Sequence, residues 1–294
     1  MKKKFSLLLI MMAVLTVIFI NPVKSNAQTK LLIRCDDIGM CHSVNVAVKK
    51  LIATGIPFST SVMFACPWYQ EAVEILKANP QISVGVHLTL NSEWKNYKWG
   101  PVSRSVPSLT DSNGYFYSSN DEFVKCGYKL DEVETELRAQ VERAVHSGVH
   151  IDYLDTHILI GSIPGIIAIV EKLAKEYHLG ISGYFNEHYE TLWDTDPEYK
   201  FKHLMGIVDS LRNNQPNLLV IHLGQDTREM EALIDLNYQP DPYRVSKHRQ
   251  AEFDALSSPA FREIIQKLNI KLTTYKELIS KEGLKNMKLQ GEIF

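Results

Sequence analysis

The sequence lacks the features that mark several classes of protein. Neither half of the chain carries a basic stripe, acidic and basic residues are interspersed, and the formal net charge is −2, which argues against a nucleic-acid partner. It contains no low-complexity tract, internal repeat or heptad pattern, so fibrous and repeat architectures are excluded. Its four cysteines lack C-x-x-C spacing, which disfavours a thiolate zinc site, and they are too few for a dense disulfide framework. What remains is the composition of an ordinary globular protein, with 45% hydrophobic residues.

The N-terminus carries a long apolar run. Lysines at positions 2–4 precede an uncharged apolar stretch at residues 5–20, and a small-x-small pattern ends at Ala27. This order predicts a cleaved signal peptide (residues 1–27) and a mature chain that begins near Gln28. A retained membrane anchor is the alternative, but the run is short for a span of about 20 residues. We therefore expect an exported protein, periplasmic or extracellular, without a stable membrane span after cleavage.

Residues 28–294 have the length of one α/β barrel, which commonly takes about 250 residues. Short β-rich runs alternate with stretches of helical period, and this predicts a single domain of β-α units around a parallel sheet. The interval 91–130 lacks a sustained period, so we expect a long loop excursion there. The seven expected strands cover residues 31–35, 58–64, 82–90, 150–154, 180–184, 217–222 and 271–274.

Candidate catalytic residues lie at the expected C-terminal ends of four strands. In a parallel barrel these ends open onto one face, so their side chains converge. Individually, an aspartate here can cap the following helix, and a histidine in an apolar strand is more often a buried core residue. Convergence of several such residues favours a site. The set is Asp36 and Asp37, His87, Asp155 with His157, and His222.

One carboxylate and two imidazoles leave coordination positions open for water and substrate, as in a catalytic metal site. Such a metal lowers the pKa of a bound water, which then serves as the nucleophile, and it polarises a carbonyl. A second carboxylate can accept the proton and a further histidine can protonate the leaving group. The ligand types favour one Zn²⁺ and also accommodate Mg²⁺ or another divalent ion. The spacing alone leaves open whether Asp36 or Asp37 holds the metal.

Three motifs in this order resemble those of the YdjC-like carbohydrate deacetylases, also called the ChbG/HpnK family. They are Arg34-Cys-Asp-Asp-Ile-Gly39 followed by Val44-Asn45, Gly85-Val-His-Leu-Thr-Leu90, and Asp155-Thr-His157. The resemblance spans nearly the whole mature chain. It implies an incomplete (β/α) TIM-like barrel that uses a divalent metal to remove acetyl groups from N-acetylated sugars or oligosaccharides.

The same resemblance assigns roles to residues. It implies that Asp37, His87 and His157 are the metal ligands, that Asp36 is the general base and that His222 is the acid. Arg249 and Glu252 match a late Arg-x-x-Glu helix of the family, which implies a structural role or support of the base. An esterase on the same ligands and a catalytically silent glycan-binding protein on the same fold are the rival functions. Nothing in the sequence specifies an oligomeric state.

Two features concern the substrate. The family's third motif usually reads D-S-H-x-H-x-H, whereas the two later histidine positions are Leu159 and Gly161 in this sequence. A His-Pro-Gly that is frequent in the family reads His222-Leu223-Gly224 here.

The excursion at residues 91–130 is rich in aromatic residues that either form a glycan-binding wall or pin the loop to the barrel. These are Trp94, Tyr97, Trp99, Tyr115, Phe116 and Tyr117.

Overall fold

The structure is a computed structural model that describes residues 28–237 and 245–288 of the 294-residue chain. The predicted signal peptide, residues 1–27, lies outside the described residues. Across the described ranges, no helix combines the length and the apolar character that crossing a membrane requires.

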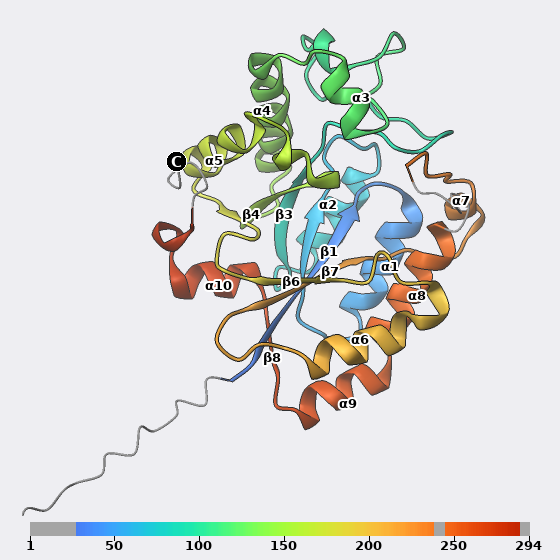
Figure 1. Cartoon of the computed structure of the whole chain (residues 1–294), viewed down its shortest axis with the longest axis vertical. Coiled ribbons are helices and arrows are strands. Elements are labelled where there is room, and N and C mark those ends of the chain that lie inside the picture. Colours follow the sequence, from blue (N-terminus) through green and yellow to red (C-terminus); the bar gives the residue numbers. More distant parts are fainter. Residues whose placement is uncertain (1–27, 238–244, 289–294) are drawn as a thin grey trace, which may run out of the picture.

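A single curled parallel sheet forms the centre of the molecule (Figure 1). Its strands run in the order β5-β4-β3-β2-β1-β7-β6, and β8 pairs with the start of β1 beside that path. Among the described residues the end strands β5 and β6 do not pair with each other, so the barrel is incomplete, as the family resemblance implied. The strands are β1 Lys30–Ile38, β2 Ser59–Val62, β3 Ser83–Leu88, β4 Tyr153–Thr156, β5 Gly180–Ile181, β6 His188–Thr191, β7 Asn217–His222 and β8 Lys271–Thr273.

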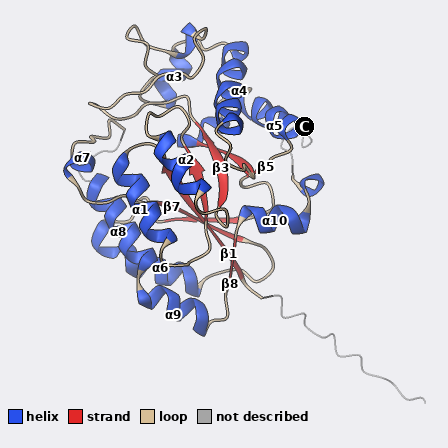
Figure 2. Cartoon of the chain, turned by 180° about the vertical axis from the view of Figure 1, so that it is seen from behind, coloured by secondary structure: helices blue, strands red, loops and turns tan. Residues whose placement is uncertain are grey.

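Helices surround the sheet, and the view from behind shows α1, α2, α6 and α8 beside it (Figure 2). Short 3₁₀ turns lie at Pro107–Leu109, His157–Ser162, Pro197–Tyr199 and Leu284–Asn286. The helices are α1 His42–Ile52, α2 Tyr69–Lys77, α3 Asn120–Lys125, α4 Leu130–His146, α5 Ile166–Tyr177, α6 Lys200–Asp209, α7 Arg228–Glu231, α8 Val245–Ser257, α9 Pro259–Lys267 and α10 Tyr275–Glu282.

Strand alternation separates two buried regions. In β1, Leu31, Ile33 and Cys35 belong to the main core, whereas Leu32 belongs to a smaller cluster. Because alternate residues of a strand point to opposite faces, Arg34 and Asp36 share the face of Leu32. The polar residues near the end of β1 therefore lie on the same face as this smaller apolar cluster, directly after it along the strand. That smaller cluster comprises Leu32, Tyr153, Phe185, Leu218, Val220, Tyr275 and Leu278.

Most predicted elements are present with shifted ends, and four helices or strands were not predicted. One is α3, a short helix within the expected loop excursion, where the side chain of Ser119 caps it. Strand β6 has the sequence His-Tyr-Glu-Thr, which lacks an apolar alternation because it is a partly exposed edge strand. Helix α10 starts directly after β8, where the side chain of Thr274 caps it, and α7 is a single short turn. The strand expected at residues 150–154 is β4, whose later boundary places Asp155 inside the sheet.

Candidate metal centre and active site

The adjacent residues Asp36 and Asp37 line the same cavity because β1 is irregular at this point. Neighbours in a regular strand point to opposite faces. Here the pairing of β1 with β2 shifts between Cys35 and Ile38, and Asp37 has a φ of 67°. Aspartate adopts this left-handed conformation more readily than most residues, and a bulge of this kind re-aims a side chain. The irregular backbone thus gives one strand end two carboxylates.

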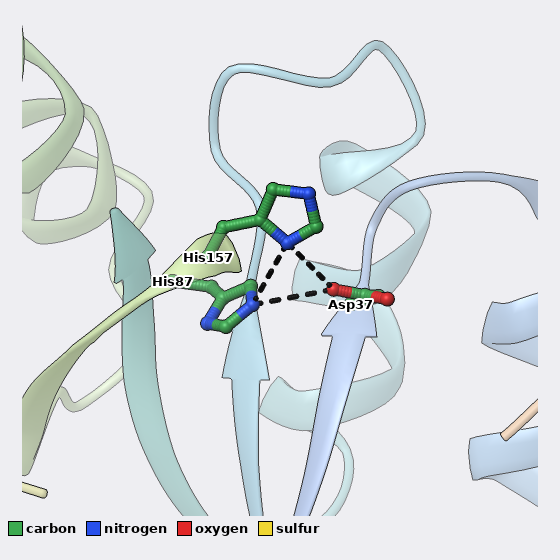
Figure 3. A group of neighbouring side chains, drawn as sticks. All are labelled: Asp37, His87 and His157. Carbon is green, nitrogen blue, oxygen red and sulfur yellow. Dashed lines mark hydrogen bonds and ion pairs between the residues drawn. The ribbon is translucent and has the colours of Figure 1, made fainter. Parts of the chain in front are cut away.

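Asp37, His87 and His157 come together at the ends of their strands (Figure 3). Asp37 Oδ1 lies 3.2 Å from His87 Nε2 and 3.3 Å from His157 Nδ1. The two imidazole nitrogens are 3.2 Å apart. Ligand atoms about 2.1 Å from a metal lie roughly 3.4 Å apart in tetrahedral geometry and roughly 3.0 Å apart in octahedral geometry. The three atoms therefore have the spacing of one face of a coordination shell.

The polarity of this group also fits a cation. All three side chains are buried, and Asp37 Oδ1 has ion-pair contacts with the two imidazoles but no well-aligned hydrogen bond among the described residues. Leaving a carboxylate oxygen buried and unsatisfied is unfavourable. A divalent ion between the three atoms would satisfy it.

Each of the three candidate ligands has an outward partner. His87 Nδ1 lies 2.8 Å from Asp155 Oδ1, and Asp37 Oδ2 accepts a 2.6 Å hydrogen bond from Arg249 Nη2. His157 Nε2 lies 3.1 Å from Glu93 Oε2. Hydrogen bonds of this kind orient metal ligands and select the imidazole tautomer.

Charge within the group shifts the pKa of each member. Burial opposes ionisation of Asp37, but Arg249 and the two imidazoles hold its pKa well below the usual value. Burial also opposes a charge on His87, yet Asp155 and Asp36 raise its pKa well above the usual value. Burial likewise opposes a charge on His157, but Glu93 and Asp37 together raise its pKa to about 9. In the metal-free protein both imidazoles hold protons at neutral pH, so metal binding must release protons.

Asp36 lies in a second acidic group that already contains a cation. Its Oδ1 and Oδ2 accept hydrogen bonds of 2.7 and 2.6 Å from Nε and Nη2 of Arg34. Arg34 Nε also lies 3.0 Å from Asp155 Oδ2. Atoms of Asp36, His87 and Asp155 are close enough for a metal, but Arg34 supplies their positive charge. The group with Asp37 is therefore the better candidate.

His222 lies beside Asp36 in the register of β1 and β7. Its Nδ1 is buried and has no hydrogen-bond partner within the described ranges. The Trp193 ring packs edge-on against the imidazole, with centroids 4.8 Å apart. Burial lowers the pKa of His222 to about 4, so the imidazole is neutral at neutral pH.

Helix α8 carries the two predicted supporting residues one turn apart. Arg249 contacts Asp37, the candidate ligand, rather than Asp36. Glu252 Oε2 accepts a 2.6 Å hydrogen bond from the backbone N–H of His222, and its Oε1 accepts one of 2.6 Å from Lys200 Nζ. One helix thus fixes both a candidate ligand and the end of β7.

The site lies in a cavity of about 580 Å³. Of the six aromatic residues of the excursion that were candidates for a glycan-binding wall, only Trp94 lines the cavity. Trp99 and Phe116 are buried in the core, and Tyr97 and Tyr117 pack against it, so these residues pin the excursion to the barrel. Aromatic lining comes instead from β6 and the segment after it. The cavity is lined by Arg34, Asp36, Asp37, His87, Glu93, Trp94, Asn120, Thr156, His157, Ile158, Leu159, Ser162, Tyr189, Thr191, Trp193, Asp194, Val220, His222, Asp235, Asn237 and Arg249.

Two residues that contact members of the site, Arg34 and Glu93, were not assigned a role from the sequence. Arg34 lies two residues before Asp36, and this spacing places both on one strand face, so the pairing had a local signal. Glu93 had none, because its contact with His157 joins residues 64 positions apart.

The fold and the site define a class: an open parallel α/β barrel with an Asp-His-His group at the C-terminal ends of its strands. The family model described as YdjC-like protein matches residues 30–267. The chain therefore belongs to the YdjC-like family, and the predicted membership is confirmed.

Two relatives match the chain in sequence, and one solved structure matches it in fold. A carbohydrate deacetylase of Brevibacillus brevis is 34% identical over 52% of this chain, which spans only 58% of that relative. A carbohydrate deacetylase of Vibrio parahaemolyticus is 27% identical over 85% of this chain and 97% of its own length. An Enterococcus faecalis structure, described as a candidate cellobiose-phosphate cleavage protein, matches with a TM-score of 0.68 and 24% identity, covering 85% of this chain and 99% of that chain. It is similar in fold.

Proposed function

We propose that this chain is a metal-dependent carbohydrate deacetylase that hydrolyses the acetamide group of N-acetylated sugars or oligosaccharides. Membership of the YdjC-like family and the relatives named carbohydrate deacetylase support the reaction class. The observation that carries the metal dependence is the triangle of Asp37, His87 and His157 atoms, with edges of 3.2 to 3.3 Å.

Asp37 Oδ1, His87 Nε2 and His157 Nδ1 would hold one divalent ion, with Zn²⁺ favoured and Mg²⁺ or another divalent ion accommodated. When bound, such an ion lowers the pKa of a coordinated water and polarises the acetyl carbonyl. The remaining polar residues of the cavity then position the substrate and move protons.

Asp36 is the proposed general base. Its two hydrogen bonds from Arg34 fix the plane of the carboxylate beside the candidate metal centre. A base held in one orientation accepts a proton from an attacking water without first losing side-chain freedom. Arg34 is therefore a positioning residue for the base.

His222 is the proposed acid for the departing amine. Its pKa of about 4 means that the resting imidazole is neutral. Negative charge that develops on the acetyl oxygen during attack favours protonation of this buried imidazole. The proton that Asp36 takes from the attacking water passes to His222, its neighbour in the strand register, and from His222 to the amine nitrogen as the C–N bond breaks.

The direct test is an acetate-release screen over N-acetylated and O-acetylated oligosaccharides, with and without a chelator. The proposal predicts acetate and a new sugar amine from N-acetylated substrates, loss of both with the chelator, and recovery with Zn²⁺. An Asp36→Asn variant should bind zinc normally and release no acetate. Release from O-acetyl esters alone would identify an esterase, and binding of glycans unaffected by Asp36→Asn would identify a silent glycan-binding protein.

Export remains a proposal that rests on residues 1–27. The basic start, the apolar run and the small-x-small pattern before Gln28 support it. N-terminal sequencing of protein recovered from outside the cytoplasm should begin near Gln28. Recovery of the full-length chain from the cytosol would contradict export without affecting the proposed chemistry.

A further inference from the structure

We infer that Glu93 is a positioning residue that holds His157 in the tautomer able to bind the metal. This inference rests on the metal site of the proposed function. It adds a role for the excursion that follows β3, because Glu93 ties this segment to a candidate metal ligand.

The contact joins two buried side chains. Glu93 Oε2 lies 3.1 Å from His157 Nε2, and the side chains are 4% and 6% exposed. In Figure 3 the Nε2 of His157 points away from Asp37 and His87, while Nδ1 points at both. A neutral imidazole carries its proton on one nitrogen only. A carboxylate that accepts the Nε2 proton leaves the Nδ1 lone pair facing the metal position.

The two candidate histidine ligands are supported in different ways. His87 uses Nδ1 to contact Asp155, its paired residue on the neighbouring strand, so the sheet fixes both partners. His157 lies just beyond β4 and is followed by Ile158 and Leu159, whose φ values are 44° and 54°. Within the part of the chain that the structure describes, His157 has no β-ladder partner. Support for its ring comes from Glu93 instead.

Glu93 is itself held by backbone contacts. The N–H of Leu236 donates to the Glu93 carbonyl at 3.1 Å, and the N–H of Lys95 donates to the Ile234 carbonyl at 2.9 Å. Trp94, between them, forms an antiparallel bridge with Asp235. The Trp94 indole N–H also points at Met40 Sδ, 3.2 Å away. The carboxylate of Glu93 therefore projects from a segment anchored on two sides.

The test compares zinc affinity in Glu93→Leu, Glu93→Gln and the matched control Glu122→Gln, measured by competition with a chromophoric chelator. Glu122 is an exposed carboxylate of the same excursion that does not line the cavity. Loss of an outer-shell partner typically weakens metal binding by about 10- to 100-fold. We expect a loss of this size for Glu93→Leu, a smaller loss for Glu93→Gln, whose amide oxygen still accepts the proton, and no change for Glu122→Gln.

A double-mutant cycle with His157→Ala separates positioning from general structural damage. If Glu93 acts through His157, Glu93→Leu should not weaken zinc binding further once the imidazole is absent. Zinc-loaded wild type should also show a solvent-protected imidazole N–H resonance that disappears in Glu93→Leu. Zinc affinity in Glu93→Leu within twofold of wild type would overturn the inference, as would an undiminished effect in the His157→Ala background.

The outcome separates this inference from the proposed function. Normal wild-type zinc binding with the expected Glu93 effect, but without acetate release from any sugar, would keep the inference and reject the deacetylase. Acetate release that needs zinc, combined with an unchanged zinc affinity in Glu93→Leu, would keep the deacetylase and reject the inference. Failure of the wild type to bind zinc, Mg²⁺ or any other divalent ion supplied would reject both.

Discussion

Replacing Arg249 with methionine tests the charge balance of the candidate metal centre. Arg249 and Asp37 are each 1% exposed, and their contact is 2.6 Å. Removing one partner of a buried ion pair typically costs about 3 to 5 kcal/mol, because the remaining charge is left uncompensated. Arg249 Nε and Nη1 have no hydrogen-bond partner among the described residues. Their removal offsets part of the loss, so we expect a cost of about 3 kcal/mol in the metal-free protein.

A loss of about 3 kcal/mol corresponds to a fall in Tm of roughly 6 to 12 °C for a domain of this size. A divalent ion beside Asp37 replaces the missing positive charge, so Zn²⁺ should raise the Tm of Arg249→Met more than that of wild type. Differential scanning fluorimetry with and without zinc measures both effects.

The matched control is Lys247→Met on the same helix. Lys247 pairs with Asp226 at 2.6 Å, but the lysine side chain is 63% exposed. Such a surface pair contributes about 0 to 1 kcal/mol, so the Tm should change little with or without zinc. Equal effects of the two substitutions in the metal-free protein would refute the reasoning, as would a zinc shift no larger in Arg249→Met than in wild type.

Three further predictions concern pH, backbone strain and packing. His157 has a pKa of about 9, and the pKa of His87 is raised well above its usual value, so each imidazole must lose a proton to bind zinc and apparent zinc affinity should fall by more than about tenfold per pH unit below 9; a flat profile in chelator competition between pH 7 and 9 would contradict this. Leu159 has a φ of 54° and is 70% exposed, so Leu159→Asn should relieve strain and raise the Tm by about 2 to 4 °C; a lower Tm would argue against strain. A Cβ on Gly85 would lie 2.4 Å from the Tyr153 ring, so Gly85→Ala should cost about 1 to 3 kcal/mol in urea unfolding. Combined with Tyr153→Leu it should cost less than the sum of the single changes, and additivity would show that the clash is absent.

The sequence was sufficient to predict the barrel and the residues that converge at its strand ends. His87 and His222 occupy predictable positions because strand periodicity and the common direction of parallel strands determine where strand ends meet. The two carboxylates were harder to place, since regular alternation would put Asp36 and Asp37 on opposite faces. The positive φ of Asp37 brings both to one cavity, and no hydrophobic pattern reports such a bulge.

The contacts that organise the site were the least predictable. Glu93 reaches His157 from an irregular segment, and the contact depends on backbone pairing between segments more than a hundred residues apart. Strand β6 is short and polar, so its contribution of Tyr189 to the cavity could not be foreseen. Tertiary packing, rather than local preference, determines these features.

Titration of metal-stripped protein with Zn²⁺, followed by acetate release from an N-acetylated oligosaccharide, tests the central claim most directly. The geometry of Asp37, His87 and His157 predicts that activity is absent without metal and rises linearly to a plateau at one equivalent of zinc per chain. Full activity in the metal-stripped protein would contradict the account, and so would a plateau at two equivalents.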